Sequence, residues 1–340
     1  RNEALVPLLL IASFLVYFLQ NFWAFDMISS YIMFFLTLAF SGFLIYPAAK
    51  DVAQDQASDP KINKTIPFVG ALLIVLTIFT FFLGNIQPAR ASKAILKGLA
   101  SSSELLPAFR KAFSLSPIVR FEGPEQLSFR VTTLFGEGGQ EQELLRQGFQ
   151  LAEQEFQKSI EKNPLDFRFY LFLGRHYNYF YSFINSKEYL TKAEEVLAKA
   201  QELSPKNQQV YFNLAQLRFL EGRDEEAIEF LRQAKDLDPN FLTARWHLLR
   251  ALNLVGKYDL AIEELQELED LGFDSKQSKE TLMEVIDIFE KAEKPAQELV
   301  PLYEKRIEFD PQDIVLWEKL VNVYIAAGEL EKARQAAQKV

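Results

Sequence analysis

Residues 211–239 read YFNLAQLRFLEGRDEEAIEFLRQAKDLDP, and this stretch decides the fold. Its apolar residues recur every three or four positions in two runs, which is the spacing of amphipathic helices. Gly222 separates the two runs and Pro239 follows the second, so the stretch predicts two helices joined by a short turn. The small residues Ala227 and Ala234 allow the two helices to pack closely.

The same pattern recurs at a fixed spacing. Ala227 and Ala261 are 34 residues apart, as are Pro205 and Pro239. This is the period of the tetratricopeptide (TPR) repeat, a helix–turn–helix unit. Motif positions in other units are occupied by Tyr170, Leu173, Gly174, Tyr177, Ala193, Leu197 and Ala200, by Leu248, Leu249, Leu252, Gly256 and Leu265, and by Trp317, Leu320, Val321, Tyr324, Gly328 and Ala333.

Two units depart from the motif. The first contains about seven extra residues around YFYSFINSKEY, and the unit at 278–311 has Leu299 where a small alanine is expected. Upstream, LAEQEFQKSIEKNP and FRKAFSLSP resemble second helices of atypical repeats. We therefore expect a TPR α-solenoid over residues 147–340, preceded by connecting helices and a degenerate repeat at 90–146. Its hairpins are stabilised by stacking on their neighbours.

The first quarter of the chain is apolar. Uncharged runs at about 4–25, 28–47 and 66–86 each reach the length that crosses a bilayer. The complete fold class that we expect is all-α, with three transmembrane helices in residues 1–89 followed by the solenoid. Asp26 lies between the first two runs and is interpreted as a turn; the alternative is a functional carboxylate inside the membrane.

Loop charges predict the topology. The loop at 48–65 carries Lys50, Lys61 and Lys64, whereas the turn at Asp26 carries no Lys or Arg, so the loop is predicted to be cytoplasmic. Three spans then place the repeats outside the cytoplasm, although the cations at 90–97 argue in the opposite direction. Asn63 begins a glycosylation sequon that we discount, because it falls on the cytoplasmic side.

Composition excludes several functional classes. A net charge of −9 argues against a nucleic-acid partner, and the absence of cysteine excludes disulfides and thiolate metal sites. The chain begins with Arg1 and ends within a helical pattern, so we expect a piece of a longer protein.

Candidate catalytic residues are few. His176 and His247 lie in predicted first helices and are read as structural rather than as ligands or bases. The acidic run at 224–226 suits a helix start, and the glycine-rich segment 135–141 suits a turn better than a phosphate loop. We predict no catalytic centre, cofactor or metal in this chain.

The inner face of such an array is the candidate binding surface. Arg175, Gln216 and Arg250 occupy equivalent places in successive units. This ladder suits a carboxylate-bearing peptide or a glycan, with aromatic residues as stacking surfaces. The alternative is a solvated face without a ligand. The residues predicted to line this face are Arg175, Asn178, Tyr179, Phe212, Gln216, Phe219, Trp246, Arg250 and Asn253.

The paired runs around QNFWAFDMISSYIMFFLTLAF, a further run ending NIQPARASKAI and a repeat array from NPLDFRFYLFLGRHYNYF resemble the C-terminal part of O-antigen ligase-like membrane proteins of bacteria. The resemblance implies a multi-pass protein of the inner membrane that transfers a glycan from a polyprenyl-diphosphate carrier. It also implies extracytoplasmic repeats that bind an acceptor or a protein partner. The family's catalytic histidine and arginines have no match here.

Two further functions stay open from the sequence. One is a membrane-anchored TPR scaffold that binds other proteins and has no catalytic activity. The other is an assembly factor whose repeats lie in the cytoplasm.

Overall fold

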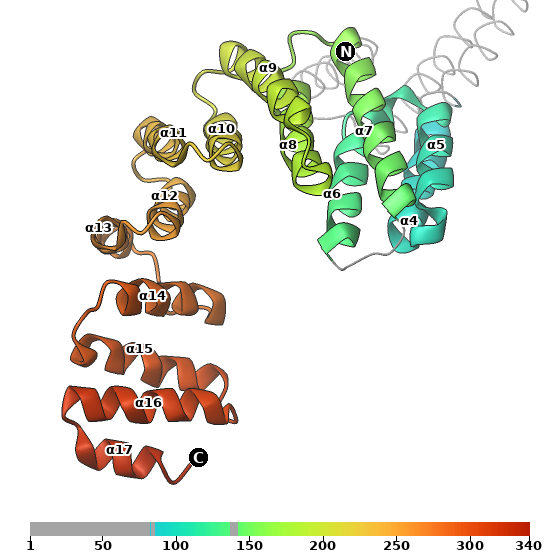
Figure 1. The fold of residues 1–340 in the computed structure, drawn as a ribbon. Helices are drawn as coiled ribbons and strands as arrows, with labels where there is room; N and C mark the ends of the chain where they lie inside the picture. Colours follow the sequence, from blue (N-terminus) through green and yellow to red (C-terminus); the bar gives the residue numbers. More distant parts are fainter. Residues whose placement is uncertain (1–81, 83–85, 137–141) are drawn as a thin grey trace, which may run out of the picture. The chain divides into compact units, whose positions relative to one another are not determined.

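The computed structural model describes residues 82, 86–136 and 142–340. Within these ranges it contains fourteen α-helices, two short 3₁₀ helices and no strand (Figure 1). The expected spans at 4–25, 28–47 and 66–86, with Asp26 and Asn63, fall outside the described residues, apart from Phe82 and Ile86. Across the described ranges, no helix combines the length and the apolar composition that crossing a bilayer requires.

The first four helices precede the regular repeats. The two upstream stretches that resemble second helices are helical, lying in α5 and α7, and these pack against α4 and α6 respectively. The bounds are α4 (Gln87–Ala100), α5 (Leu105–Leu115), α6 (Gly123–Gly136) and α7 (Gln142–Lys162), with 3₁₀ helices η2 (Ser102–Glu104) and η3 (Pro117–Arg120) between them.

Five helical hairpins follow and confirm the all-α TPR array. The first helix of each hairpin packs against the second, and successive hairpins stack. They are α8 (Phe167–Ile184) with α9 (Lys187–Leu203), α10 (Gln208–Leu220) with α11 (Asp224–Leu237), α12 (Leu242–Leu254) with α13 (Tyr258–Asp270), α14 (Lys279–Lys291) with α15 (Ala296–Phe309), and α16 (Ile314–Ala327) with α17 (Leu330–Ala336).

The predicted glycine turns are confirmed. Gly222, Gly256 and Gly328 have φ values of 74°, 78° and 80°, a left-handed conformation that glycine adopts without steric cost. The atypical first hairpin instead ends α8 at Asn185, with φ of 55°. Its extra residues lengthen α8 to 18 residues, whereas α10 and α12 have 13 each.

In several units the proline of the motif accepts a hydrogen bond from a side chain near the start of the following helix. The Tyr211 hydroxyl donates to the Pro205 carbonyl at 2.8 Å, and the Trp317 indole N–H donates to the Pro311 carbonyl at 3.0 Å. Both donors lie six residues after their proline. In the third hairpin Arg245 occupies this position, and its Nε donates to the Pro239 carbonyl at 2.7 Å. The same contact is thus made by a charged residue that the aromatic motif does not predict.

The hydrophobic core is nearly continuous through α10. One buried cluster extends from Ala91 to Leu217, and a second extends from Ala215 to Ala336. Helix α10 contributes to both, because Leu214 and Leu217 belong to the first cluster and Ala215 to the second. The partly buried Phe230 packs against both clusters, so the α10–α11 hairpin couples the two parts of the array.

Candidate partner-binding groove

A groove of about 840 Å³ lies along the first helices of four successive hairpins, α8, α10, α12 and α14. Its wall combines aromatic rings with amide and charged groups. The lining residues are Arg175, Tyr179, Gln209, Phe212, Asn213, Ala215, Gln216, Phe219, Leu231, His247, Arg250, Ala251, Asn253, Leu254, Tyr258, Glu284 and Lys291.

Seven of the nine predicted surface residues line this groove. They are Arg175, Tyr179, Phe212, Gln216, Phe219, Arg250 and Asn253. The two others lie elsewhere: Asn178 is completely buried, and Trp246 packs its ring against Phe273, with the ring centroids 5.2 Å apart. The helical period identifies one side of each helix, but it does not distinguish the groove from the adjoining contact between hairpins.

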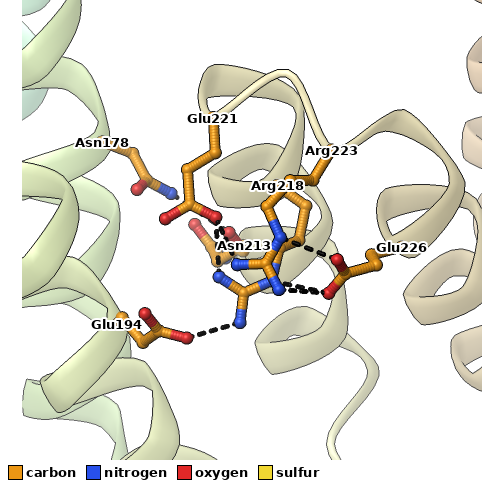
Figure 2. Close-up of polar contacts among 7 residues, drawn as sticks. All are labelled: Asn178, Glu194, Asn213, Arg218, Glu221, Arg223 and Glu226. Atoms are coloured by element: carbon orange, nitrogen blue, oxygen red, sulfur yellow. Dashed lines mark hydrogen bonds and ion pairs between the residues drawn. The ribbon is translucent and has the colours of Figure 1, made fainter.

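Asn178 belongs to a polar junction behind the groove (Figure 2). Its side-chain amide donates to the Asn213 carbonyl at 3.1 Å, which links α8 to α10. In the same junction the buried Arg218 donates to Glu194 on α9 at 2.5 Å and to Glu221 at 2.8 Å. These bonds fix α10 relative to the preceding hairpin, so Asn178 positions the groove wall instead of facing a ligand.

The two arginines of the ladder differ in how they are paired. Arg175 donates to Glu125 on α6 at 2.6 Å, and both side chains are about one third exposed or less. Arg250 lies 3.7 Å from Glu284 on α14 without a hydrogen bond, and 55 % of its side chain is exposed. Arg250 therefore has the guanidinium that is more available to an incoming carboxylate.

Asn253 connects the groove to α14 and keeps an acceptor without a partner. Its amide nitrogen donates to Glu284 at 2.8 Å and to Asp287 at 3.0 Å. Its amide oxygen is buried and has no hydrogen-bond partner among the described residues. A buried amide oxygen in this state has a free energy cost, and its burial keeps it out of reach of a ligand in the groove.

His247 lies on the groove wall next to Phe212, with the ring centroids 4.7 Å apart. Burial lowers the pKa of this imidazole below its ordinary value of 6.5, and the charge of Arg250 lowers it further. His247 is therefore predominantly neutral at pH 7, so its ring presents an aromatic face and one N–H donor to the groove.

His176 has a structural environment. It is 1 % exposed; its Nδ1 lies 2.8 Å from the Ser128 hydroxyl and its Nε2 lies 3.1 Å from the Phe149 carbonyl. Because a carbonyl only accepts, Nε2 carries the proton and Nδ1 accepts from Ser128. Burial lowers the pKa of His176 to about 3. This neutral ring joins α6, α7 and α8, and both of its nitrogens are occupied.

Sequence reasoning missed two charged residues of the groove, Glu284 and Lys291. Glu284 lies 34 residues after Arg250 and so continues the same ladder, which means that the repeat period could have identified it. Lys291 pairs with Asp287 at 2.7 Å at the end of α14 and follows no motif position. No group of three or more metal-ligating side chains occurs in the part of the chain that the structure describes.

Comparisons with known proteins agree with the fold. A tetratricopeptide repeat family model matches residues 190–253, which include most of the groove wall and all the residues of Figure 2 except Asn178. No curated protein matches. This match and the repeated helical hairpins show that the chain is a TPR repeat protein.

Three solved structures show the extent of the similarity. YrrB, a TPR protein with an unusual peptide-binding site, is 21 % identical, and the match covers 54 % of this chain and 89 % of YrrB with a TM-score of 0.41. A TPR protein from Parabacteroides merdae is 16 % identical, with coverage of 64 % and 78 % and a TM-score of 0.40. PilF from Pseudomonas aeruginosa is 15 % identical, with coverage of 72 % and 98 % and a TM-score of 0.40.

Proposed function

We propose that this chain is a scaffold whose groove binds an extended, carboxylate-bearing segment of a protein partner. The observation that carries the proposal is the exposed guanidinium of Arg250 on a wall that also contains Phe212, His247 and Tyr179. A carboxylate that approaches Arg250 can form charge-assisted hydrogen bonds, and the neighbouring rings can cover apolar side chains.

The charges of the groove favour an acidic over a basic partner. Arg175, Arg250 and Lys291 line it, but Arg175 is paired with Glu125 and Lys291 with Asp287. Arg250 forms no hydrogen bond to Glu284, so it is the cation that an acidic segment can reach on an otherwise acidic array. A glycan that carries carboxylates has the same chemistry and is the second candidate ligand.

Peptide-library selection followed by fluorescence anisotropy tests this function. We expect acidic peptides to bind and Arg250→Ala to weaken binding about tenfold, because a hydrogen bond to a charged group contributes about 1.5–3 kcal/mol. Arg232→Ala is the matched control, since Arg232 is a comparably exposed arginine on α11 and does not line the groove. Equal losses for both variants, or selection of basic peptides, would refute the proposal.

The resemblance to O-antigen ligase-like proteins supports a more specific proposal. According to this proposal, the chain is the C-terminal membrane and TPR segment of a glycan ligase or polymerase of the bacterial inner membrane, and its repeats lie outside the cytoplasm. The groove would then bind an acceptor or an assembly partner. The alternative is a membrane-anchored scaffold without catalysis.

Two measurements separate these proposals. Sequencing the gene upstream of Arg1 distinguishes the ligase from the scaffold. Further apolar spans and a large loop with His and Arg support the ligase, whereas a nearby start codon supports the scaffold.

The second measurement tests on which side of the membrane the repeats lie. The chain has no cysteine, so a single Ser204→Cys variant can be labelled specifically. Labelling of intact cells by a membrane-impermeant thiol reagent is expected, and labelling only after lysis would place the repeats in the cytoplasm.

A further inference from the structure

Positive charge is concentrated in the first two described helices. Residues 86–121 contain six Lys or Arg side chains and one acidic side chain, Glu104. Residues 122–340 contain 27 Lys or Arg against 40 Asp or Glu. Five of the cations lie in α4 and α5: Arg90, Lys93, Lys97, Arg110 and Lys111. The sixth, Arg120, lies in η3 and is paired with the buried Glu155 at 2.6 Å. This reversal of sign within one chain requires a physical explanation, because it is larger than the local mixing of charges on an ordinary surface.

The α4 helix presents its cations on one side. Arg90, Lys93 and Lys97 are spaced three and four residues apart and are all exposed. The other side of α4 carries the small residues Ala91, Ala94 and Gly98, which are buried and allow close packing. A side chain at Gly98 would place its Cβ 3.0 Å from the Phe109 ring, so α4 lies tightly on α5. The cations are therefore displayed by a firmly packed helix.

Exposed apolar residues accompany these cations. Leu96 on α4 is 67 % exposed, and Ile86, directly before this helix, is 39 % exposed. On α5, Arg110 and Lys111 are also exposed. Within the described ranges, the only acidic partner found for the cations of α4 and α5 is Glu104, 3.0 Å from Lys97, and both of those side chains are largely solvated. Such an exposed pair is weak and leaves the lysine available.

We infer that the α4–α5 hairpin lies against an anionic phospholipid surface, with its lysines and arginines on the phosphate groups and Leu96 at the acyl boundary. A basic helix with exposed apolar residues has the composition of an interfacial segment, and anionic headgroups attract each nearby Lys or Arg. The hairpin also follows the apolar run at 66–84 within a few residues. A nucleic acid is the less suitable polyanion, because the acidic array would repel its length. The inference does not depend on what the groove binds.

A fluorescent probe in the full chain tests this inference. Ser92 is exposed on α4, and the chain has no native cysteine, so Ser92→Cys can be labelled with an environment-sensitive fluorophore. The chain is reconstituted in nanodiscs of phosphatidylcholine, either alone or with one quarter phosphatidylglycerol. We expect a blue-shifted emission and reduced quenching by iodide only in the discs with phosphatidylglycerol, and we expect high salt to reverse both.

Charge reversal supplies the control. The triple variant Arg90→Glu, Lys93→Glu, Lys97→Glu should lose the lipid-dependent shift, whereas reversal of Lys305, Lys319 and Arg334 near the C-terminal end should retain it. All six residues are at least partly exposed, and circular dichroism checks that both variants fold. Identical spectra in the two kinds of disc would overturn the inference. So would a shift that a short DNA duplex, but not phosphatidylglycerol, produces.

Discussion

Arg245 and Arg250 lie five residues apart on α12, yet the two faces of this helix use arginine in different ways. Arg245 is 9 % exposed; it contacts the Pro239 carbonyl, Glu264 at 2.7 Å and Glu267. The side chain of Arg250 is 55 % exposed and only approaches Glu284. The back of the helix therefore fixes the hairpin, while the groove face keeps a cation available. The same residue type is structural or functional according to its burial and its partners.

Among substitutions that compare the two faces, Arg245→Ala is expected to lower the free energy of unfolding most. The substitution removes the hydrogen bond to Pro239 and leaves the buried Glu264 with Lys235, 2.9 Å away, as its remaining cation. Breaking a buried ion pair costs about 3–5 kcal/mol, so we expect unfolding free energy to fall by about 3 kcal/mol. Urea denaturation measures this, with Arg232→Ala as the exposed control. A loss below 1 kcal/mol would contradict the structural role.

The next largest loss of stability is expected when the packing between α8 and α9 is disturbed. In Gly174→Ala the new Cβ would lie 2.5 Å from Leu197 Cδ2 and Cγ, and Leu197 is itself fully buried. Overpacking of this kind costs about 1–3 kcal/mol. Gly136→Ala is the control, because a Cβ there meets no atom within 4 Å. Thermal unfolding should separate the two variants, and equal melting temperatures would show that α8 and α9 can move apart without cost.

His176 makes the α6–α8 contact dependent on pH. Its folded-state pKa of about 3 lies below its ordinary value of 6.5, so the stabilisation is present above pH 6.5 and is lost as pH falls toward 3. From pH 7 to 5 we expect a loss of about 2 kcal/mol in the wild type. His176→Gln keeps a polar group but does not titrate. Urea unfolding at both pH values should show a smaller loss in this variant, and equal losses would exclude His176 as the cause.

The smallest effects on stability are expected on the groove face. Arg175→Ala and Arg250→Ala remove exposed or partly exposed pairs, which contribute about 0–1 kcal/mol. Of the two, Arg175→Ala should cost more, because Arg175 forms a hydrogen bond to Glu125 and Arg250 forms none to Glu284. A loss as large as that of Arg245→Ala would mean that both faces of the helices are structural.

The repeat period predicted the regular part of this structure because it reflects contacts that recur every 34 residues. The left-handed glycines, the buried alanines and seven groove residues all follow from local spacing. Asn178 and Trp246 show the limit of this reasoning, since their positions depend on the neighbouring hairpin or loop. Arg245 could not be predicted either, because its partners Glu264 and Glu267 lie 19 and 22 residues away and follow no motif.

The contact between Arg250 and Glu284 also matches two adjacent hairpins by charge. These residues hold the same position in the α12 and α14 units, whereas the α10 unit has the neutral Gln216 there. Duplicating the α12–α13 hairpin in tandem would place one Arg250 beside another and add a repulsive contact, while the second copy would keep its contact with Glu284. Duplicating the α10–α11 hairpin would place Gln216 beside Gln216, which is electrostatically neutral. An array of this kind can lengthen by gene duplication more readily at its uncharged unit than at its charged one.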